Sequence, residues 1–308
     1  MDNLHKSVSA LMALQDEITD GSHQLYHRVV AAMHALCYTI LDAEKNGCSE
    51  EEIARAVAPA RELHSRSVFV KRLQEWPRQY PGDFETVEYI CSLENKSLYG
   101  TVEYFIEEYA LNSAIAQQHR NKLHTQSRII LDAVLNNERP VKILSVGCGG
   151  CRDIMDIKEF IIEKPLELVI NDIDDDALKL SGDRLADIAG VQFISGNIIQ
   201  AIRKVEALGP FDLIVTGGLF DHMSDKHIAF FLKHVKLSML KPGGRLFFTN
   251  VVDNNPFRVW MEQLADWRLN YRTEEGLRKL VTDAGFSESV MAITKDETGL
   301  SFLVTLQN

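Results

Sequence analysis

The stretch KILSVGCGGCRDIMDI, residues Lys142–Ile157, determines the predicted fold class of this chain. A mostly apolar run up to Val146 predicts a β-strand, the turn Gly147–Gly150 follows it, and a helical pattern begins behind the turn. Glycines let the backbone approach a ligand closely, and the first N–H groups of a helix have no partner inside the helix. The stretch therefore indicates a binding site for a nucleotide-type ligand.

A carboxylate follows where such a ligand needs one. The next predicted strand, 166–171, runs directly into Asp172, about 25 residues after the glycine turn, where a carboxylate accepts hydrogen bonds from both hydroxyls of a ribose. The alternative role of Asp172 is to cap the helix that follows. The NAD-type spacing Gly-x-Gly-x-x-Gly requires glycine at position 152, and this chain has Arg152 there. The spacing therefore disfavours NAD.

Short β-rich runs alternate with helical segments throughout the second half of the chain. This alternation predicts a parallel sheet with helices on both faces. The last two β-like runs, 288–294 and 300–306, are joined by the turn residues 295–299, which predicts a hairpin and adds an antiparallel pair to the sheet. The predicted parallel strands are 142–146, 166–171, 191–195, 211–216 and 245–251.

The first part of the chain has the pattern of a helical domain. Apolar residues recur with the helical period over 23–41, and Ser49 with Glu52 forms a capping box for the next helix. One long helix is predicted from about Val102 to Leu135. The predicted domains are a helical N-terminal domain, residues 1–137, and an α/β domain, residues 138–308.

The composition excludes several classes of protein. The formal net charge is −11, and no dense cluster of Lys and Arg is present, which disfavours a nucleic-acid partner. The N-terminal residues 1–17 lack the apolar core of a signal peptide, and no apolar stretch is long enough for a membrane span. Five cysteines, an odd number, are expected as reduced thiols in the cytoplasm. No metal is expected, the predicted partner is a small molecule, and the oligomeric state stays open.

Several motifs in order resemble those of class I S-adenosylmethionine (SAM) methyltransferases. They are ILSVGCGG (143–150), LVINDIDDDAL (168–178), FDLIVTGGLFDHMSD (211–225) and LKPGGRLFFTNV (240–251). The resemblance covers residues 138–308. It implies SAM as cofactor and a Rossmann-like α/β sheet of strand order 3-2-1-4-5-7-6, with the seventh strand antiparallel.

A narrower resemblance extends into the helical part. YPGDFETVEYI (80–90), GLFDHMSD (218–225) and the segment 255–277 resemble a bacterial subgroup that includes enzymes making 3-hydroxypalmitate methyl ester signals. This resemblance implies carboxyl O-methylation. Two positions depart from the pattern: Ser145 stands where many class I enzymes have an acid that meets the methionine amine, and His222 stands where tyrosine is expected.

The motifs and the resemblance together predict the site residues. The predicted catalytic residues are His222, Asp221 and Arg258. The predicted cofactor-binding residues are Tyr80, Asp83, Arg120, Ser145, Gly147, Cys148, Gly149, Asp172, Ile173, Asn197, Ile198, Gly217 and Leu219.

Several of these roles have a structural alternative. Asn197 either meets the adenine edge or caps the helix after it. Tyr80 and Asp83 either belong to a lid that reaches the methionine end of SAM or form an ordinary turn and helix cap. Arg120 either pairs with the methionine carboxylate or lies on a solvated face. The pair Cys148 and Cys151 is expected to pack beside the cofactor, with a redox or zinc role as the alternative.

His222 is the candidate for proton transfer, because imidazole titrates near neutral pH. Its alternative is a histidine satisfied in a turn. Methylation of a carboxylate requires no base, since the carboxylate is already a nucleophile and positioning it in line with the methyl group supplies most of the rate. In that reaction His222 or Arg258 orients the acid.

The sequence leaves three functions open. The first is methylation of a carboxylate or hydroxyl oxygen of a small, acyl-chain metabolite of secondary metabolism. The second uses the aminocarboxypropyl arm of SAM, by transfer or by cyclisation to azetidine-2-carboxylate, and releases methylthioadenosine. Ser145 in place of the usual acid is the feature that keeps this second function open. The third is a non-catalytic protein on the same fold.

Overall fold

The computed structural model describes residues 1–19 and 23–308. By internal packing the chain divides into two compact units, each described here by itself. The helical unit comprises Met1–Gln117 and Pro256–Arg268, and the sheet unit comprises Gln118–Asn255 and Leu269–Asn308. No helix among the described residues is long and apolar enough to cross a membrane.

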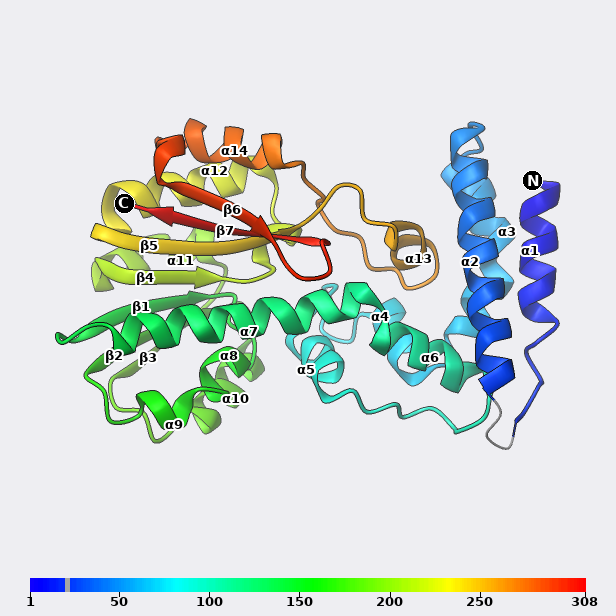
Figure 1. Ribbon diagram of the computed structural model, residues 1–308, viewed down its shortest axis with the longest axis horizontal. Helices are drawn as coiled ribbons and strands as arrows, with labels where there is room; N and C mark the ends of the chain where they lie inside the picture. Colours follow the sequence, from blue (N-terminus) through cyan, green and yellow to red (C-terminus); the bar gives the residue numbers. More distant parts are fainter. Residues whose placement is uncertain (20–22) are drawn as a thin grey trace. The chain divides into compact units, whose positions relative to one another are not determined.

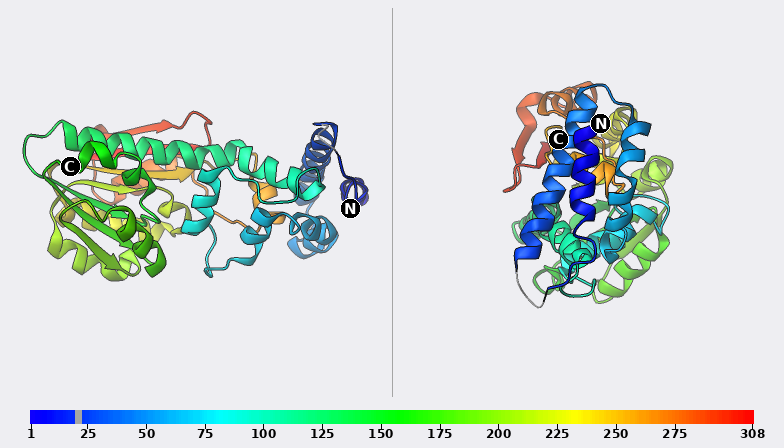
Figure 2. Two further views of the ribbon diagram at one scale, coloured as in Figure 1. Left: turned by 90° about the horizontal axis from the view of Figure 1, so that it is seen from below. Right: turned by 90° about the vertical axis from the view of Figure 1, so that its right-hand side faces the viewer.

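Amphipathic helices build the helical unit. Their apolar faces are buried, as in α2, where Val29, Met33, Leu36 and Ile40 recur at helical spacing with 0% exposure. Helices α1, α2 and α3 pack side by side, shown in blue in Figures 1 and 2. The helices are α1 (Asp2–Met12), α2 (His23–Lys45), α3 (Glu50–His64), α4 (Val68–Glu75), α5 (Phe84–Ser92), α6 (Val102–Asn112) and α13 (Arg258–Gln263).

Local sequence signals set several helix ends. The predicted capping box is confirmed, because the side chain of Ser49 accepts a hydrogen bond from the Glu52 N–H and the Glu52 carboxylate accepts one from the Ser49 N–H. The single helix predicted from Val102 to Leu135 is wrong. Ser113 is extended (φ −63°, ψ 153°) and separates α6 from α7 (Ala114–Leu135). The Ser113 hydroxyl accepts from the Ala116 N–H, so a local side-chain cap competes with helix continuation at this point.

The sheet unit contains a seven-stranded sheet in the order β3-β2-β1-β4-β5-β7-β6 (Figure 1), which confirms the predicted topology. Strands β1 to β5 pair in parallel, and β7 pairs antiparallel with both β5 and β6. The strands are β1 (Val141–Val146), β2 (Leu166–Asp172), β3 (Val191–Ser195), β4 (Phe211–Thr216), β5 (Leu240–Val251), β6 (Met291–Lys295) and β7 (Ser301–Gln307).

Two predicted strand ends shift in the structure. The predicted start of the terminal hairpin, 288–290, is a short 3-10 turn, and β6 begins at Met291. The strand predicted at 245–251 begins earlier, since β5 starts at Leu240, which pairs with Phe211. Gly243 has φ +77° and the pairing with β4 shifts register between Phe211 and Leu213, so the added part of the strand is distorted.

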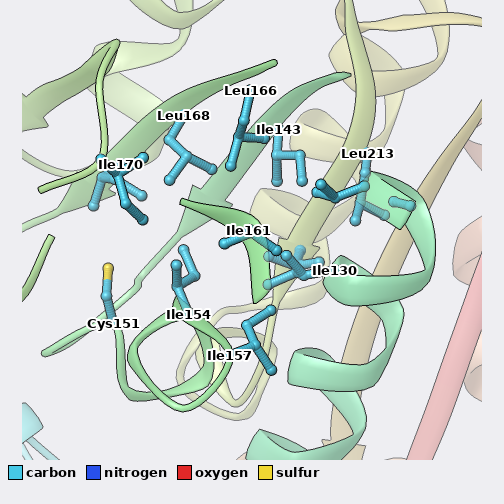
Figure 3. Close-up of a cluster of buried hydrophobic side chains, with 14 of the residues drawn as sticks. Ile130, Ile143, Cys151, Ile154, Ile157, Ile161, Leu166, Leu168, Ile170 and Leu213 are labelled. Atoms are coloured by element: carbon cyan, nitrogen blue, oxygen red, sulfur yellow. The ribbon is translucent and has the colours of Figure 1, made fainter. Parts of the chain in front are cut away.

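Helices cover the faces of this sheet. On one face, apolar residues of α7, α8, α9 and α10 pack onto β1, β2 and β4, and Figure 3 shows Ile130, Ile154 and Ile161 facing Ile143, Leu168 and Leu213. The remaining elements are α8 (Arg152–Met155), α9 (Lys158–Ile161), α10 (Asp175–Arg184), α11 (Ile198–Leu208), η1 (Leu219–His222), α12 (Asp225–His234), η2 (Val235–Met239), α14 (Glu274–Asp283) and η3 (Glu288–Val290).

The division into units does not follow the border predicted at residue 137. Most of α7 belongs to the sheet unit, because Ile130, Ala133 and Val134 are part of the core under β1. The segment 256–268 belongs to the helical unit, where Trp260 makes edge contacts with Tyr109. The sequence pattern changes where the strands begin. The border between the units instead depends on which core the apolar side chains of α7 and of 256–268 enter.

A buried carboxylate joins several helices of the helical unit. Glu107 in α6 is fully buried. Burial by itself raises its pKa, but hydrogen bonds from Tyr89, Ser97 and backbone N–H groups outweigh this and lower the pKa of the carboxyl group. The donors are Ser67 Oγ (3.0 Å), Phe69 N (3.1 Å), Tyr89 Oη (2.6 Å), Lys96 N (2.7 Å) and Ser97 Oγ (2.7 Å).

Replacing Glu107 by glutamine is expected to lower the free energy of unfolding by about 3 kcal/mol, because an amide turns an NH₂ group toward donors. A carboxyl group with a lowered folded-state pKa stabilises above its unfolded pKa and loses this effect as the pH falls. The difference between wild type and Glu107→Gln should therefore be constant above about pH 5 and shrink as the pH falls below the unfolded-state pKa of about 4.3. Urea unfolding at several pH values measures it, with the exposed Glu62→Gln as control. Equal stability of Glu107→Gln and wild type at pH 7 would contradict the assignment.

Candidate active site

The candidate site lies where the strand order of the sheet reverses. From β1 the chain adds β2 and β3 on one side, and then returns to add β4 and β5 on the other side. Parallel α/β sheets bind their ligands at the carboxyl ends of the strands beside such a reversal, because the loops diverge there and leave a crevice. In this chain the position lies between β1, which ends at Val146, and β4, which ends at Thr216.

The glycine turn after β1 has backbone angles that side chains rarely adopt. Gly147 has φ +61° and Gly149 has φ +54°, and the N–H groups of Gly147 and Cys148 donate to the Asn171 carbonyl at 2.9 and 3.2 Å. A Cβ on Gly147 would lie 3.5 Å from Leu219, so the turns after β1 and β4 come into contact. The helix expected behind the turn, α8, is only four residues long. Close backbone approach is therefore what this turn offers a ligand.

The thiols of Cys148 and Cys151 in this turn pack against the protein interior. Cys151 is fully buried in the apolar core (Figure 3). Burial, with smaller contributions from Cys151 and Asp172, raises the pKa of the Cys148 thiol well above its usual value. The Cys148 thiol is therefore protonated at neutral pH and a poor nucleophile.

Asp172 is the last residue of β2 and is almost completely buried (7% exposed). Its Oδ2 accepts from the Gly149 N–H at 2.8 Å and its Oδ1 accepts from the Asp174 N–H at 3.0 Å. Burial raises the pKa of this carboxyl group. The cap of α10 is Asp174, so capping is not the role of Asp172. The carboxylate of Asp172 thus holds the glycine turn against the end of β2, and Ile173 beside it exposes 58% of its surface.

The residues after β3 follow their structural alternative. Asn197 is the N-cap of α11, since its Oδ1 accepts from the Ile199 N–H at 2.9 Å, and Ile198 is buried. Asn171, which the sequence did not single out, ties β2 to β3 because its Nδ2 donates to the carbonyls of Ile194 and Gly196. The sequence signal for this link between β2 and β3 was an asparagine at the end of an apolar strand.

Two glycines after β4 leave room for polar side chains of α7. A Cβ on Gly217 would lie 1.8 Å from Gln126 Oε1, so the Gln126 side chain would have to move, and a Cβ on Gly218 would lie 3.1 Å from Lys122 Nζ. Gly218 has φ +91° and its N–H donates to Thr249 Oγ1. The sequence predicted Gly217 as a site residue but did not identify its partners on α7.

The row of α7 residues that includes Lys122 and Gln126 is buried and polar. Gln118, Lys122 and Gln126 are 0%, 4% and 6% exposed. Within residues 1–19 and 23–308, no hydrogen-bond partner exists for Gln118 Nε2 and Oε1, Lys122 Nζ, Gln126 Oε1 and Thr216 Oγ1. Burying a polar atom without a partner costs free energy, so such a concentration marks a position that a ligand or ordered water fills.

Asp221, a predicted catalytic residue, is 2% exposed and anchors the segment η1. Its Oδ1 accepts from the Val251 N–H at 2.7 Å, its backbone carbonyl accepts from the Asn270 N–H at 2.7 Å, and its Oδ2 lies 3.6 Å from Lys122 Nζ. The carboxylate thus joins η1 to β5 and α7, and the backbone carbonyl joins it to the segment before α14. The structure therefore gives Asp221 a positioning role beside His222.

His222, the other predicted catalytic residue of η1, is exposed to solvent. Desolvation by the surrounding protein lowers the pKa of the His222 imidazole. The negative charge of Asp221 opposes this shift, and the positive charge of Lys122 adds to it. The neutral ring therefore predominates at neutral pH. Arg272, which the sequence did not identify, holds the segment in place by donating to the carbonyls of Phe220 (2.8 Å) and Met223 (2.6 Å) on either side.

Arg120 and Ser145 lie in the sheet unit, on α7 and β1. Ser145 is 3% exposed and pairs in register with Ile170 and Val215 at the centre of the sheet. Arg120 is half-buried. It is two residues away from both Gln118 and Lys122, so it lies on another face of the helix. The structure brings Ser145, the glycine turn, Asp172, the β4 turn and η1 to one edge of the sheet.

Three predicted residues lie in the helical unit. Asp83 caps α5, accepts from the Thr86 N–H at 2.8 Å, and pairs with Arg72 at 2.6 Å. Arg258 pairs with Glu44 at 2.5 Å and Glu262 at 3.0 Å, and the Glu44 hydrogen bond raises its pKa. The structure thus supplies structural partners for Asp83 and Arg258. Tyr80 is half-buried in the segment before α5.

In the described part of the chain, no group of three or more His, Cys, Asp or Glu side chains is arranged to hold a metal ion.

Comparison with known proteins agrees with this geometry. Residues 144–246 match the family model described as a methyltransferase domain, a segment that contains the glycine turn, Asp172 and η1. A search of curated proteins found no match.

Solved structures with a similar fold include a possible exported protein from Bordetella parapertussis, at a TM-score of 0.58 and 15% identity over 100% of this chain and 96% of that one. Magnesium protoporphyrin IX methyltransferase from Synechocystis PCC 6803 is similar at a TM-score of 0.47 and 15% identity, over 63% and 87% of the chains. At 15% identity, the likeness to the Bordetella parapertussis protein concerns the fold alone. The sheet order and the matched segment together show a Rossmann-like fold with a methyltransferase domain match at residues 144–246.

Proposed function

We propose that this protein transfers a methyl group from SAM to a carboxylate or hydroxyl oxygen of a small, acyl-chain metabolite. The observation that carries the proposal is the edge of the sheet at β1 and β4, where Asp172, the glycine turn and five partnerless buried polar atoms meet. A nucleoside with a charged tail needs this combination. It needs an acceptor for its ribose, a backbone free of side chains, and polar groups beyond.

The residues present fit SAM. The Asp172 carboxylate can accept ribose hydroxyls while it holds Gly149, because each carboxylate oxygen accepts more than one hydrogen bond. Gly147 and Gly149 keep the backbone bare beside it, and exposed Ile173 offers an apolar surface to a base. When bound, SAM supplies an electrophilic methyl group on a sulfonium.

The residues of the chain orient the acceptor and can take up its proton. Arg272 and Asp221 hold η1, so that His222 stays at the mouth of the site with a neutral ring. A neutral imidazole can accept the proton of a hydroxyl acceptor or donate a hydrogen bond to a carboxylate acceptor. Alignment of the acceptor oxygen with the methyl group supplies most of the rate in either reaction.

The narrower resemblance supports an acyl-chain acceptor and secondary metabolism as part of this proposal. A cytoplasmic location belongs to it as well, since an odd number of cysteines, five, is typical of a protein with reduced thiols. We also propose that Tyr80, Asp83, Arg120 and Arg258 assist with cofactor or acceptor, as the sequence predicts.

Incubation of the purified protein with SAM tests the reaction class. S-adenosylhomocysteine is expected only when an acceptor is added, and 3-hydroxydecanoate serves as probe because it carries both a carboxylate and a hydroxyl. Mass spectrometry of the product distinguishes a methyl ester from a methyl ether. Methylthioadenosine released from SAM alone would overturn methyl transfer, since it signals use of the aminocarboxypropyl arm.

Replacing Asp172 by asparagine is expected to weaken S-adenosylhomocysteine binding by about tenfold or more, because a hydrogen bond to a charged acceptor is lost. Isothermal titration calorimetry measures the affinity. Asp183→Asn, at an exposed position of the following helix α10, is the matched control and should bind as wild type does. An unchanged affinity of Asp172→Asn would remove the ribose role.

The variant His222→Asn distinguishes the acceptors. With a hydroxyl acceptor the rate is expected to fall about 100-fold or more, and the wild-type rate should rise with pH and level off below neutrality, because the His222 pKa is lowered. With a carboxylate acceptor the loss should stay within about tenfold and the pH dependence should be flat, since the nucleophile is already ionised. His227→Asn, exposed on α12, is the control. A variant His222→Asn with wild-type rates on both acceptors would exclude His222 from the reaction.

A further inference from the structure

The polar row on α7 contains both a cation and an amide acceptor without hydrogen-bond partners. Lys122 Nζ has three N–H donors, and its nearest carboxylate oxygen, Asp221 Oδ2, is 3.6 Å away, beyond hydrogen-bond distance. Asp221 already accepts from the Val251 N–H. The ion pair therefore neutralises part of the charge of Lys122 and leaves its donors to another oxygen.

Gln126, one helical turn further along α7, presents the opposite polarity. Its Nε2 donates to Asp153 Oδ2 at 2.9 Å, which fixes the orientation of the amide. The amide oxygen, Oε1, consequently faces the Gly217 position, where a Cβ would lie 1.8 Å from it. Within the described residues this buried oxygen has no donor. It is thus an oriented acceptor at the end of β4.

The two residues lie on one face of one helix. Positions 122 and 126 are four residues apart, and side chains at this spacing are neighbours. Gln118, another four residues earlier, extends the row with an amide whose donor and acceptor are both without partner in the described chain. A cationic donor next to a neutral acceptor is the complement of a zwitterion, a carboxylate beside an ammonium.

The separation between Asp172 and the turn after β4 matches the length of one ligand. Asp172 ends β2, and the turn that Lys122 and Gln126 face follows β4, with β1 between them. Neighbouring strands are about 4.8 Å apart, so the two positions are separated by about 10 Å. A ribose and the amino-acid chain attached to it span such a separation.

We propose that Lys122 and Gln126 bind the amino-acid end of SAM, with Lys122 Nζ donating to the carboxylate and Gln126 Oε1 accepting from the ammonium. This inference rests on the proposed function and deepens it. It also accounts for Ser145, since an amide acceptor supplied by α7 replaces an acidic side chain on β1. A carboxylate of the acceptor alone would satisfy Lys122 but leave Gln126 Oε1 without a donor.

Three ligands separate the contributions. S-adenosylhomocysteine carries the carboxylate and the ammonium, S-adenosyl-3-thiopropylamine lacks the carboxylate, and methylthioadenosine lacks both. Calorimetric titration of the full chain measures each affinity for wild type, Lys122→Met, Gln126→Met and, as control, Lys204→Met, which changes an exposed lysine of α11.

The expected pattern is specific to each residue. Wild type should bind S-adenosylhomocysteine at least about tenfold more tightly than S-adenosyl-3-thiopropylamine. Lys122→Met should lose that preference and bind the carboxylate-free ligand unchanged. Gln126→Met should weaken both amine-bearing ligands by about tenfold and leave methylthioadenosine unaffected. Lys204→Met should behave as wild type does.

Several outcomes would overturn the inference. If Lys122→Met weakens all three ligands equally, the residue acts through the structure and not through the carboxylate. If wild type itself does not discriminate S-adenosylhomocysteine from S-adenosyl-3-thiopropylamine, no carboxylate is bound, and this comparison holds even if Lys122→Met does not fold. If wild type binds none of the ligands, the proposed function fails instead.

Discussion

The contact between two bare turns is the constraint on which the candidate site depends. Gly147 after β1 lies next to Leu219 of the turn after β4, and a side chain at Gly217 in that second turn would overlap Gln126 of α7. Positive φ angles at Gly147 and Gly218 turn the chain sharply there. Because β1 and β4 are neighbours in the sheet, these two turns lie side by side at the carboxyl ends of the strands.

Buried polar side chains beside these turns lower the stability of the sheet unit. Lys122, Gln118, Gln126 and Thr216 bury atoms without hydrogen-bond partners in the described chain, and each such atom costs about 1–3 kcal/mol when nothing binds it. Apolar residues of the same helix, such as Ile130, pack into the core two turns away. One face of α7 therefore serves the site in its first half and the fold in its second half.

Asp221 and Arg272 show how the same unit holds the reactive segment. The Asp221 carboxylate binds the Val251 N–H on β5, and Arg272 donates to the carbonyls that flank Asp221 and His222. Both side chains are buried, whereas His222 is exposed. Rigid support beneath one exposed imidazole is an arrangement suited to orienting an acceptor, since a neutral ring can donate or accept a hydrogen bond.

The sequence by itself determined the alternation of strands and helices, the glycine turn, the carboxylate at the end of β2 and the capping box at Ser49, whereas the strand order was implied by the resemblance to class I methyltransferases. These features depend on local pattern, on glycine and on residues at strand ends, which are visible along the chain. It missed the break at Ser113, the role of Asn171, and the polar row of Lys122 and Gln126. A buried lysine and an exposed lysine look identical in a helical pattern, because burial depends on what the other elements place against that face. Only the tertiary structure decided which polar side chains of α7 meet the turn after β4.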